Sequence, residues 1–311
     1  MTASMEQRPP LIFIAGPTAS GKSGVALELA RMLDAEIVSA DAYQVYRGMP
    51  ILTAAPSEDD CREIPHHMVG FLDPSENWDA ARHCRRAMQC IDDIHARGKS
   101  AIVVGGSGLY LKFLTHGISE APPSDPALRE SMASRELADL VEELKRIDPE
   151  GAAMTSLENR RYVERNLEIV LLGGKPLSYW RENWKTEPLG VGFVITREPA
   201  DQENRIARRS HLMFDLGVVE EVKQLGLCSA TAERTLGLSV IREYIAGELD
   251  KESCIKKLTL VTRQYAKRQR TWLRREQWMQ SVSADENSSS FKLATMIKTN
   301  LNLGNQNYYG E

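Results

Sequence analysis

Residues 16–23, with the sequence GPTASGKS, match a phosphate-binding loop of the pattern G-x-x-x-x-G-K-[ST] at every defined position. In such a loop the glycines let the backbone wrap around an anion, the N–H groups point inward, and the lysine adds a positive charge. Lys22 is that lysine, and the hydroxyl of Ser23 is a predicted ligand of Mg²⁺. We predict that a diphosphate or triphosphate is bound by Gly16, Pro17, Thr18, Ala19, Ser20, Gly21, Lys22 and Ser23.

A carboxylate, Asp41, directly follows a second predicted strand, AEIVSA, at 35–40. Parallel strands in an open sheet end at the same crevice, so we expect Asp41 to lie near the anion. The aspartate that often helps to hold Mg²⁺ in nucleotide-hydrolysing P-loop proteins is missing, because the apolar segment 101–104 ends in Gly-Gly-Ser-Gly. Asp41 therefore suits a base acting on an acceptor in group transfer, although a helix-capping or loop-bracing role is the alternative.

A basic stripe is predicted near the C-terminal end of the chain. Its cations recur at i, i+4, i+7 and i+11, which is one face of a helix, and they are Arg263, Lys267, Arg270 and Arg274. With Arg268 and Arg275 they make six cations and no anion in thirteen residues, on a chain of net charge −4. The stripe indicates local contact with a nucleic-acid backbone, and a merely solvated charged face is the alternative.

The elements that must position these residues alternate along the first third of the chain. Strands are expected at 11–15, 35–40 and 101–104, and helices at 22–33 and 79–97. This alternation predicts a doubly wound parallel sheet. The expected fold class is therefore α/β, with a P-loop parallel-sheet core, an inserted all-helical domain and C-terminal helices.

The pattern changes after Pro122-Pro123, where charged segments of helical period replace the β-branched runs. Further helices are expected at 126–147, 158–173, 176–184, 201–216, 217–225, 237–247 and 251–279, and one more strand at 191–196. The predicted division is a first part of the core at 1–120, a helical insertion at 121–188, the continued core at 189–280, and a loosely ordered tail at 281–311.

Bulk composition sets the class of protein. The 311 residues are 42% hydrophobic and 26% charged, as in ordinary globular proteins. Five cysteines without a CxxC pair indicate free thiols in a reducing compartment rather than a disulfide framework or a zinc site. The first ten residues contain no apolar targeting run. We expect a cytoplasmic protein that does not enter a membrane and acts as a monomer.

Several motifs in order resemble one known family closely. They are GPTASGKS, SADAYQVYRGM (39–49), PHHMVGFLDP (65–74), VVGGSGLYL (103–111) and TRQYAKRQRTWLRR (262–275). Together they resemble the bacterial tRNA dimethylallyltransferases over residues 11–275. The resemblance implies transfer of a dimethylallyl group from dimethylallyl diphosphate, with Mg²⁺, to N6 of the adenosine at position 37, just 3′ of the anticodon. The product would be N6-(dimethylallyl)adenosine in the tRNA anticodon loop.

The resemblance also implies roles for individual residues. Asp41 would be the base, Thr18 would lie near the reacting centre, and Arg209 would stabilise the departing diphosphate. The implied tRNA-facing residues are Asp41, Ala42, Tyr43, Gln44, Ser107, Arg129, Arg161, Arg165, Arg234 and Gly237, in addition to the basic stripe. The chain departs from the family's usual residues at Tyr43, Ala55, Tyr162 and Leu238.

Three other functions remain open at this stage. The first is prenyl transfer to a free adenine nucleotide, as in cytokinin-forming enzymes. The second is a small-molecule P-loop kinase, which would bind ATP and use Asp41 to activate a hydroxyl group. The third is an RNA-binding module without catalysis, which the intact Thr18, Lys22, Ser23 and Asp41 argue against.

Overall fold

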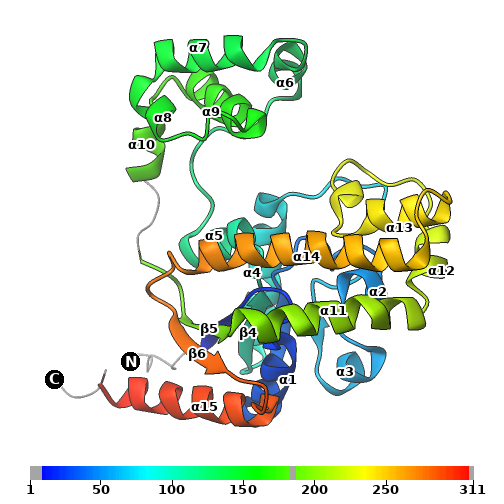
Figure 1. Ribbon diagram of the computed structural model, residues 1–311. Helices are drawn as coiled ribbons and strands as arrows, with labels where there is room; N and C mark the ends of the chain where they lie inside the picture. The colour runs from blue at the N-terminus through cyan, green and yellow to red at the C-terminus, as the bar shows by residue number, and fades with distance from the viewer. Residues whose placement is uncertain (1–8, 183–186, 308–311) are drawn as a thin grey trace. The chain divides into compact units, whose positions relative to one another are not determined.

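The computed structural model describes residues 9–182 and 187–307 (Figure 1). Its sheet has six strands, all parallel, in the order β3-β2-β4-β1-β5-β6. The strands are β1 (Leu11–Ala15), β2 (Ala35–Ser39), β3 (His66–His67), β4 (Ser100–Gly105), β5 (Val191–Arg197) and β6 (Gln280–Ala284). A parallel sheet buried by helices on both sides is the α/β architecture that the sequence predicts.

Alternate residues of each strand face opposite layers of the core. Ile12 and Ile14 of β1 pack against helix α1 (Lys22–Leu33) and helix α15 (Ser290–Asn307). Phe13 and Ala15 face the other layer. The helices that contribute buried residues to that layer are α2 (Pro50–Thr53), α4 (Ala80–Ala96), α5 (Gly108–His116), α11 (Pro199–Asp215), α12 (Val218–Lys223), α13 (Leu238–Ile245) and α14 (Lys251–Leu273). Short helices also occur as α3 (Glu58–Glu63) and as a 3₁₀ turn at Ala232–Arg234.

Residues 281–307 do not form the loosely ordered tail that the Ser- and Asn-rich composition of 281–311 predicts, and residues 308–311 lie outside the described part of the chain. Strand β6 pairs with β5, and α15 packs on α1 with Leu293, Ala294 and Ile297 buried. These apolar residues sit at helical spacing among polar ones, so one face of the helix completes the core. Composition alone hides this periodicity, and the prediction for this segment is wrong.

The helical insertion forms a compact unit of its own, His116–Glu187. It contains α6 (Pro126–Ala133), α7 (Leu137–Ile147), α8 (Pro149–Ala153), α9 (Arg160–Gly173) and α10 (Leu177–Glu182) around its own small core. The sequence predicts one helix over 126–147, but the chain breaks between α6 and α7. The remainder of the chain, Met1–Thr115 and Pro188–Glu311, makes the other unit, which carries the phosphate loop.

The strand order places β4 between β1 and β2, so the strands that end at the phosphate loop and at Asp41 are not direct neighbours. Gly105 and Gly106 at the end of β4 allow both loops to approach it closely. A Cβ on Gly105 would lie 2.5 Å from the Ala40 carbonyl oxygen, and one on Gly106 would lie 2.6 Å from that of Gly16. The Gly-Gly pair that replaces the usual aspartate therefore serves close packing of the three strand ends. None of the helices in the described part of the chain is long and apolar enough to cross a membrane.

Candidate active site

The phosphate loop links β1 to α1 and depends on two left-handed residues. Gly21 has φ +93° and Ala19 has φ +64°. Gly16 needs the absence of a side chain, because a Cβ there would lie 2.5 Å from the Ser20 hydroxyl oxygen. Lys22 and Ser23 then open helix α1, so their side chains emerge where the helix N-terminus already favours an anion.

Helix α11 and the end of β5 together hold the loop by three successive backbone carbonyls. Gln202 Nε2 donates to the Thr18 oxygen at 2.7 Å, and Arg205 Nε donates to the Ala19 oxygen at 3.0 Å. Arg197 Nε, at the end of β5, donates to the Ser20 oxygen at 2.8 Å. These side chains satisfy the three carbonyls and hold the loop in its wrapped form.

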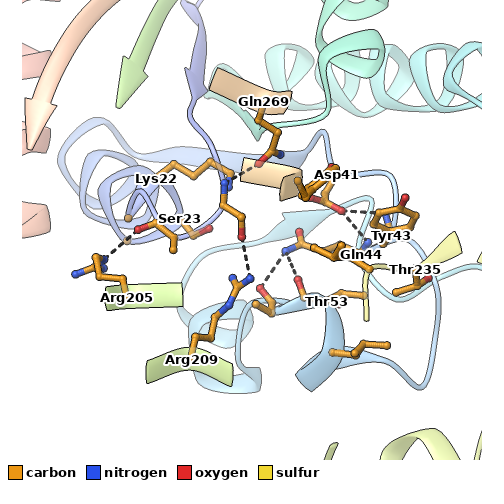
Figure 2. A pocket seen from close by; sticks show the side chains of 18 residues that line it. Lys22, Ser23, Asp41, Tyr43, Gln44, Thr53, Arg205, Arg209, Thr235 and Gln269 are labelled. Atoms are coloured by element: carbon orange, nitrogen blue, oxygen red, sulfur yellow. Dashed lines mark hydrogen bonds between the residues drawn. The ribbon is translucent and has the colours of Figure 1, made fainter. Parts of the chain in front are cut away.

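Thr18 lies at the centre of the loop and is contacted by two helices. The hydroxyl oxygen of Thr18 accepts a hydrogen bond from Arg209 of α11 at 2.8 Å, and the Thr18 N–H donates to Gln269 Oε1 of α14 at 2.8 Å. Gln269 also donates through Nε2 to the Gly106 oxygen at 2.9 Å. The three predicted catalytic side chains, Thr18, Asp41 and Arg209, line the same cavity. Figure 2 labels Asp41 and Arg209 on its wall.

This cavity has a volume of about 270 Å³ and is built entirely from the larger unit of the chain. The phosphate loop and Arg209 face it together with Asp41, as Figure 2 shows. Its lining residues are Thr18, Ala19, Gly21, Lys22, Ser23, Gly24, Asp41, Tyr43, Gln44, Leu52, Thr53, Ala54, Arg205, Arg209, Thr235, Leu236, Tyr265 and Gln269.

The electrostatics of the cavity favour an anion. Burial lowers the pKa of Lys22 to about 8, with repulsion from Arg209 acting in the same direction and the Asp41 carboxylate opposing it. Burial also lowers the pKa of the Arg209 guanidinium, and attraction to Asp41 again opposes the shift. Two cations that have lost hydration face one carboxylate, so a bound diphosphate would supply the missing negative charge.

Asp41 has a bracing role in addition to its place in the cavity. Its Oδ1 accepts from the backbone N–H of Tyr43 at 2.9 Å and of Gln44 at 3.4 Å, which closes a short turn after β2. The alternative of a loop-bracing aspartate is therefore realised by one carboxylate oxygen. The turn does not require the second oxygen, which leaves the carboxylate able to accept a proton from a substrate.

Gln44 is held by the same turn. Its Oε1 accepts from the Ser39 hydroxyl at 2.8 Å, and its Nε2 donates to the Ala54 oxygen at 3.0 Å. This pair of bonds ties the turn after β2 to the end of α2, the wall of the cavity opposite the phosphate loop. The Ala42 N–H lies 3.4 Å from the Ser107 hydroxyl oxygen, so Ser107 also supports this turn.

Several residues that the resemblance assigns to tRNA have internal partners. Arg129 and Arg165 both pair with Glu168, whose side chain is fully buried, at 3.0 and 2.6 Å. Gly237 begins α13 at φ +89°, and a Cβ there would lie 2.4 Å from Leu258 Cδ1. These contacts give all three residues a structural role in this chain, whatever they contribute to RNA.

The cations of the predicted basic stripe do not all have the same surroundings. Lys267 of α14 and Arg274 at the end of α14 are exposed. Arg161 of the insertion and Arg234 of the 3₁₀ turn are exposed as well. Arg263 is exposed but lies 3.6 Å from Glu203 of α11. Arg270 turns inward and donates to the side chain of Gln202.

Sequence reasoning missed a second set of cavity residues. Arg205 lies one turn before Arg209 on the same face of α11 and lines the cavity, and Gln202 lies one turn further and holds the Thr18 carbonyl, so helical spacing from Arg209 could have identified both. Gln269 and Tyr265 also line the cavity, and they lie between the cations of the segment 262–275, whose charge pattern gives no signal for them. The opposite wall is formed by Leu52, Thr53, Ala54, Thr235 and Leu236, of which Thr235 and Leu236 lie between Arg234 and Gly237, two residues that the resemblance assigns to tRNA.

Fold and cavity together define a P-loop α/β protein whose anion site contains a carboxylate suited to group transfer. The chain belongs to the IPP transferase family, whose sequence model matches residues 44–276. A tRNA dimethylallyltransferase of Akkermansia muciniphila is 59% identical over 290 residues, which cover 93% of this chain and 99% of that protein. A tRNA dimethylallyltransferase of Geobacter metallireducens is 40% identical over 286 residues, covering 87% of this chain and 91% of that protein.

Solved structures agree with this assignment. A tRNA isopentenylpyrophosphate transferase of Bacillus halodurans has a TM-score of 0.69 and 30% identity, over 96% of this chain and 99% of that one. A eukaryotic dimethylallyltransferase, described as acting on tRNA, has a TM-score of 0.82 and 26% identity, over 96% of this chain and 80% of that one. The α/β fold class and the family resemblance of the motifs are thereby confirmed.

Proposed function

We propose that this protein transfers a dimethylallyl group from dimethylallyl diphosphate to N6 of the adenosine at position 37 of tRNA. One observation carries the proposal: an anion cavity that joins a phosphate loop, Arg209 and Asp41. The names of its relatives, tRNA dimethylallyltransferases at up to 59% identity, support the same activity. The substrate details and the residue roles below are part of the proposal.

The side chains divide the reaction between them. As the bond from C1 of the prenyl group to the diphosphate oxygen breaks, negative charge grows on the leaving diphosphate, where Lys22 and Arg209 stabilise it. The electron pair of N6 forms the new bond to C1. Asp41 accepts the N6 proton, a role that contributes about 10²–10⁴-fold to rate for a well-placed base. Because Arg209 donates to the Thr18 hydroxyl oxygen, that hydroxyl can direct its own proton to the diphosphate.

A magnesium ion fits the side chains present. Among the described residues, no three His, Cys, Asp or Glu side chains are grouped to hold a metal ion. Mg²⁺ is commonly held by one or two protein oxygens together with substrate phosphates. Ser23 offers such an oxygen at the wall of the cavity that Asp41 also lines. When bound there with the diphosphate, the ion would neutralise part of the charge on the leaving group.

A tRNA acceptor would account for the exposed cations at the end of α14. RNA is read mainly in unpaired loops, and a base that reacts must leave its stack to enter a pocket. Lys267 and Arg274 of α14 would contact the phosphate backbone. A free adenine nucleotide would need neither these cations nor the insertion at His116–Glu187, which disfavours the nucleotide prenyltransferase alternative.

A direct test uses the purified protein with labelled dimethylallyl diphosphate and either tRNA or AMP. We expect label in tRNA, and nucleoside mass spectrometry should place it on the adenosine at position 37. A tRNA carrying guanosine there is the matched control and should stay unlabelled. Label on AMP alone would refute the proposal, and phosphate transfer from ATP would favour a kinase.

We also propose that the protein works as a monomer in the cytoplasm. All residues that line the cavity come from one unit of one chain, so a second copy is not needed to complete the site. Size-exclusion chromatography with light scattering should give the mass of a single chain, 34.8 kDa. A stable dimer under assay conditions would contradict this part of the proposal.

A further inference from the structure

Thr18 has its backbone held at both ends. Its N–H donates to Gln269 of α14, and its carbonyl oxygen accepts from Gln202 of α11. Both glutamines are buried, Gln202 completely and Gln269 with 5% of its surface exposed. The orientation of the Thr18 hydroxyl toward the diphosphate therefore depends on two buried amides.

Arg270 determines which way one of these amides points. A glutamine amide presents an oxygen and a nitrogen of nearly the same size, and only the nitrogen can donate. Arg270 donates to Gln202 Oε1, which directs Nε2 at the Thr18 oxygen. In the opposite orientation Oε1 would face the Thr18 oxygen, and two acceptors would repel each other. The arginine thus excludes the orientation that would release the loop.

The same contact removes Arg270 from the exposed basic stripe. Its neighbours Lys267 and Arg274 on α14 are exposed, whereas Arg270 is only partly exposed and bonded to a fully buried side chain. The geometry therefore gives Arg270 a different role from the one that its spacing predicts. The helix that presents cations to solvent also braces the phosphate loop.

We propose that Arg270 and Gln202 are positioning residues of the diphosphate site, acting through the Thr18 carbonyl rather than through RNA. The idea rests on the proposed function, because the diphosphate is taken to belong to a prenyl donor. It assigns Arg270 to the turnover of bound substrates and Arg274 to the binding of tRNA. Two variants that remove one positive charge from the same helix should therefore behave differently.

The first experiment compares Arg270→Gln with Arg274→Gln. Calorimetric titration with inorganic diphosphate and Mg²⁺ should give a Kd about tenfold higher for Arg270→Gln, the size expected when a buried hydrogen bond is lost. The kcat for prenyl transfer should fall by a similar factor while KM for tRNA stays near wild type. Arg274→Gln should raise KM for tRNA and leave the diphosphate Kd unchanged. Equal behaviour of the two variants would overturn the proposal.

A second experiment tests whether Arg270 acts through Gln202. Gln202→Met removes the amide at similar volume and should itself weaken diphosphate binding. On this background, Arg270→Gln should add little, because its target is already gone. If Arg270 instead attracts the diphosphate by its charge, the same tenfold effect would persist in the double variant, and the proposal would be wrong.

The readouts separate this inference from the proposed function. Diphosphate titration requires neither a prenyl group nor tRNA, so the positioning role is decided even for a protein that fails to prenylate tRNA. Thermal unfolding of each variant identifies loss of the fold. A variant that unfolds with the wild-type transition but binds diphosphate less tightly supports a positioning role, and a wild-type Kd for Gln202→Met refutes it.

Discussion

The lowered pKa of Lys22 makes diphosphate binding depend on pH in a defined direction. In the protein without diphosphate, burial lowers the pKa of Lys22 to about 8, so its ammonium group loses its proton well below the usual pH range for a lysine. A bound diphosphate favours the charged form and raises the pKa again. Binding above about pH 8 must therefore take up a proton, and affinity must fall as the pH rises.

The size of the effect follows from this pKa. With a pKa of about 8, about nine-tenths of the free protein carries a charged Lys22 at pH 7 and about one-tenth at pH 9. If only the charged form binds, the Kd for diphosphate rises about tenfold between these conditions. Titration in two buffers with different heats of ionisation should also show uptake of close to one proton near pH 9.

The matched control is Lys22→Arg, because a guanidinium does not lose its proton in this range. Diphosphate itself changes charge with pH. Dividing the wild-type Kd by the Lys22→Arg Kd at the same pH removes that contribution. We expect the ratio of wild-type to Lys22→Arg Kd to rise about tenfold from pH 7 to pH 9. A constant ratio, or binding without proton uptake, would refute the assignment of a buried, readily deprotonated lysine to this loop.

The remaining predictions concern the base, the RNA surface and the C-terminal helix. Asp41→Asn keeps an oxygen for the Tyr43 N–H but cannot accept a proton. The single-turnover rate constant should therefore fall about 10²–10⁴-fold, while the affinity for diphosphate is retained. Wild-type turnover would exclude Asp41 as the base. Replacing Lys267 and Arg274 by Gln should flatten the salt dependence of tRNA binding by roughly 0.7–0.9 per charge, and an unchanged slope would place the RNA elsewhere. Ile297→Ala should destabilise the protein by about 2–5 kcal/mol in denaturant unfolding, whereas exposed Met296→Ala should cost less than about 0.5 kcal/mol.

The local part of the site could be predicted from sequence because each step depends on nearby residues. An apolar run, a glycine-rich turn and an amphipathic helix follow one another, and the structure has β1, the phosphate loop and α1 at those places. Asp41 follows a second predicted strand, and the shared edge of a parallel sheet brings it to the cavity. The placement succeeds although β4 lies between the two strands.

The remaining site residues depend on partners distant in sequence, which one sequence does not reveal. Arg270 has the helical spacing of a surface cation, but only the approach of α11 shows that it turns toward Gln202. Arg129 and Arg165 are arginines of the kind expected on an RNA-binding surface, yet in the structure both form ion pairs with the buried Glu168. A charge pattern predicts a helix face, and the identity of its partner comes from packing.

The phosphate loop is a general anion site, and its particular chemistry comes from elements added late in the chain. Thr18 alone contacts Gln202 and Arg209 of α11 and Gln269 of α14, which follow it in the sequence by 184, 191 and 251 residues. Arg197, which holds the Ser20 carbonyl, also pairs with Asp201 and donates to the backbone of Asp285 after β6. The geometry of the loop therefore depends on contacts from elements in the C-terminal part of the chain. A change that loosens these elements on the sheet should disturb the diphosphate site as well as the fold.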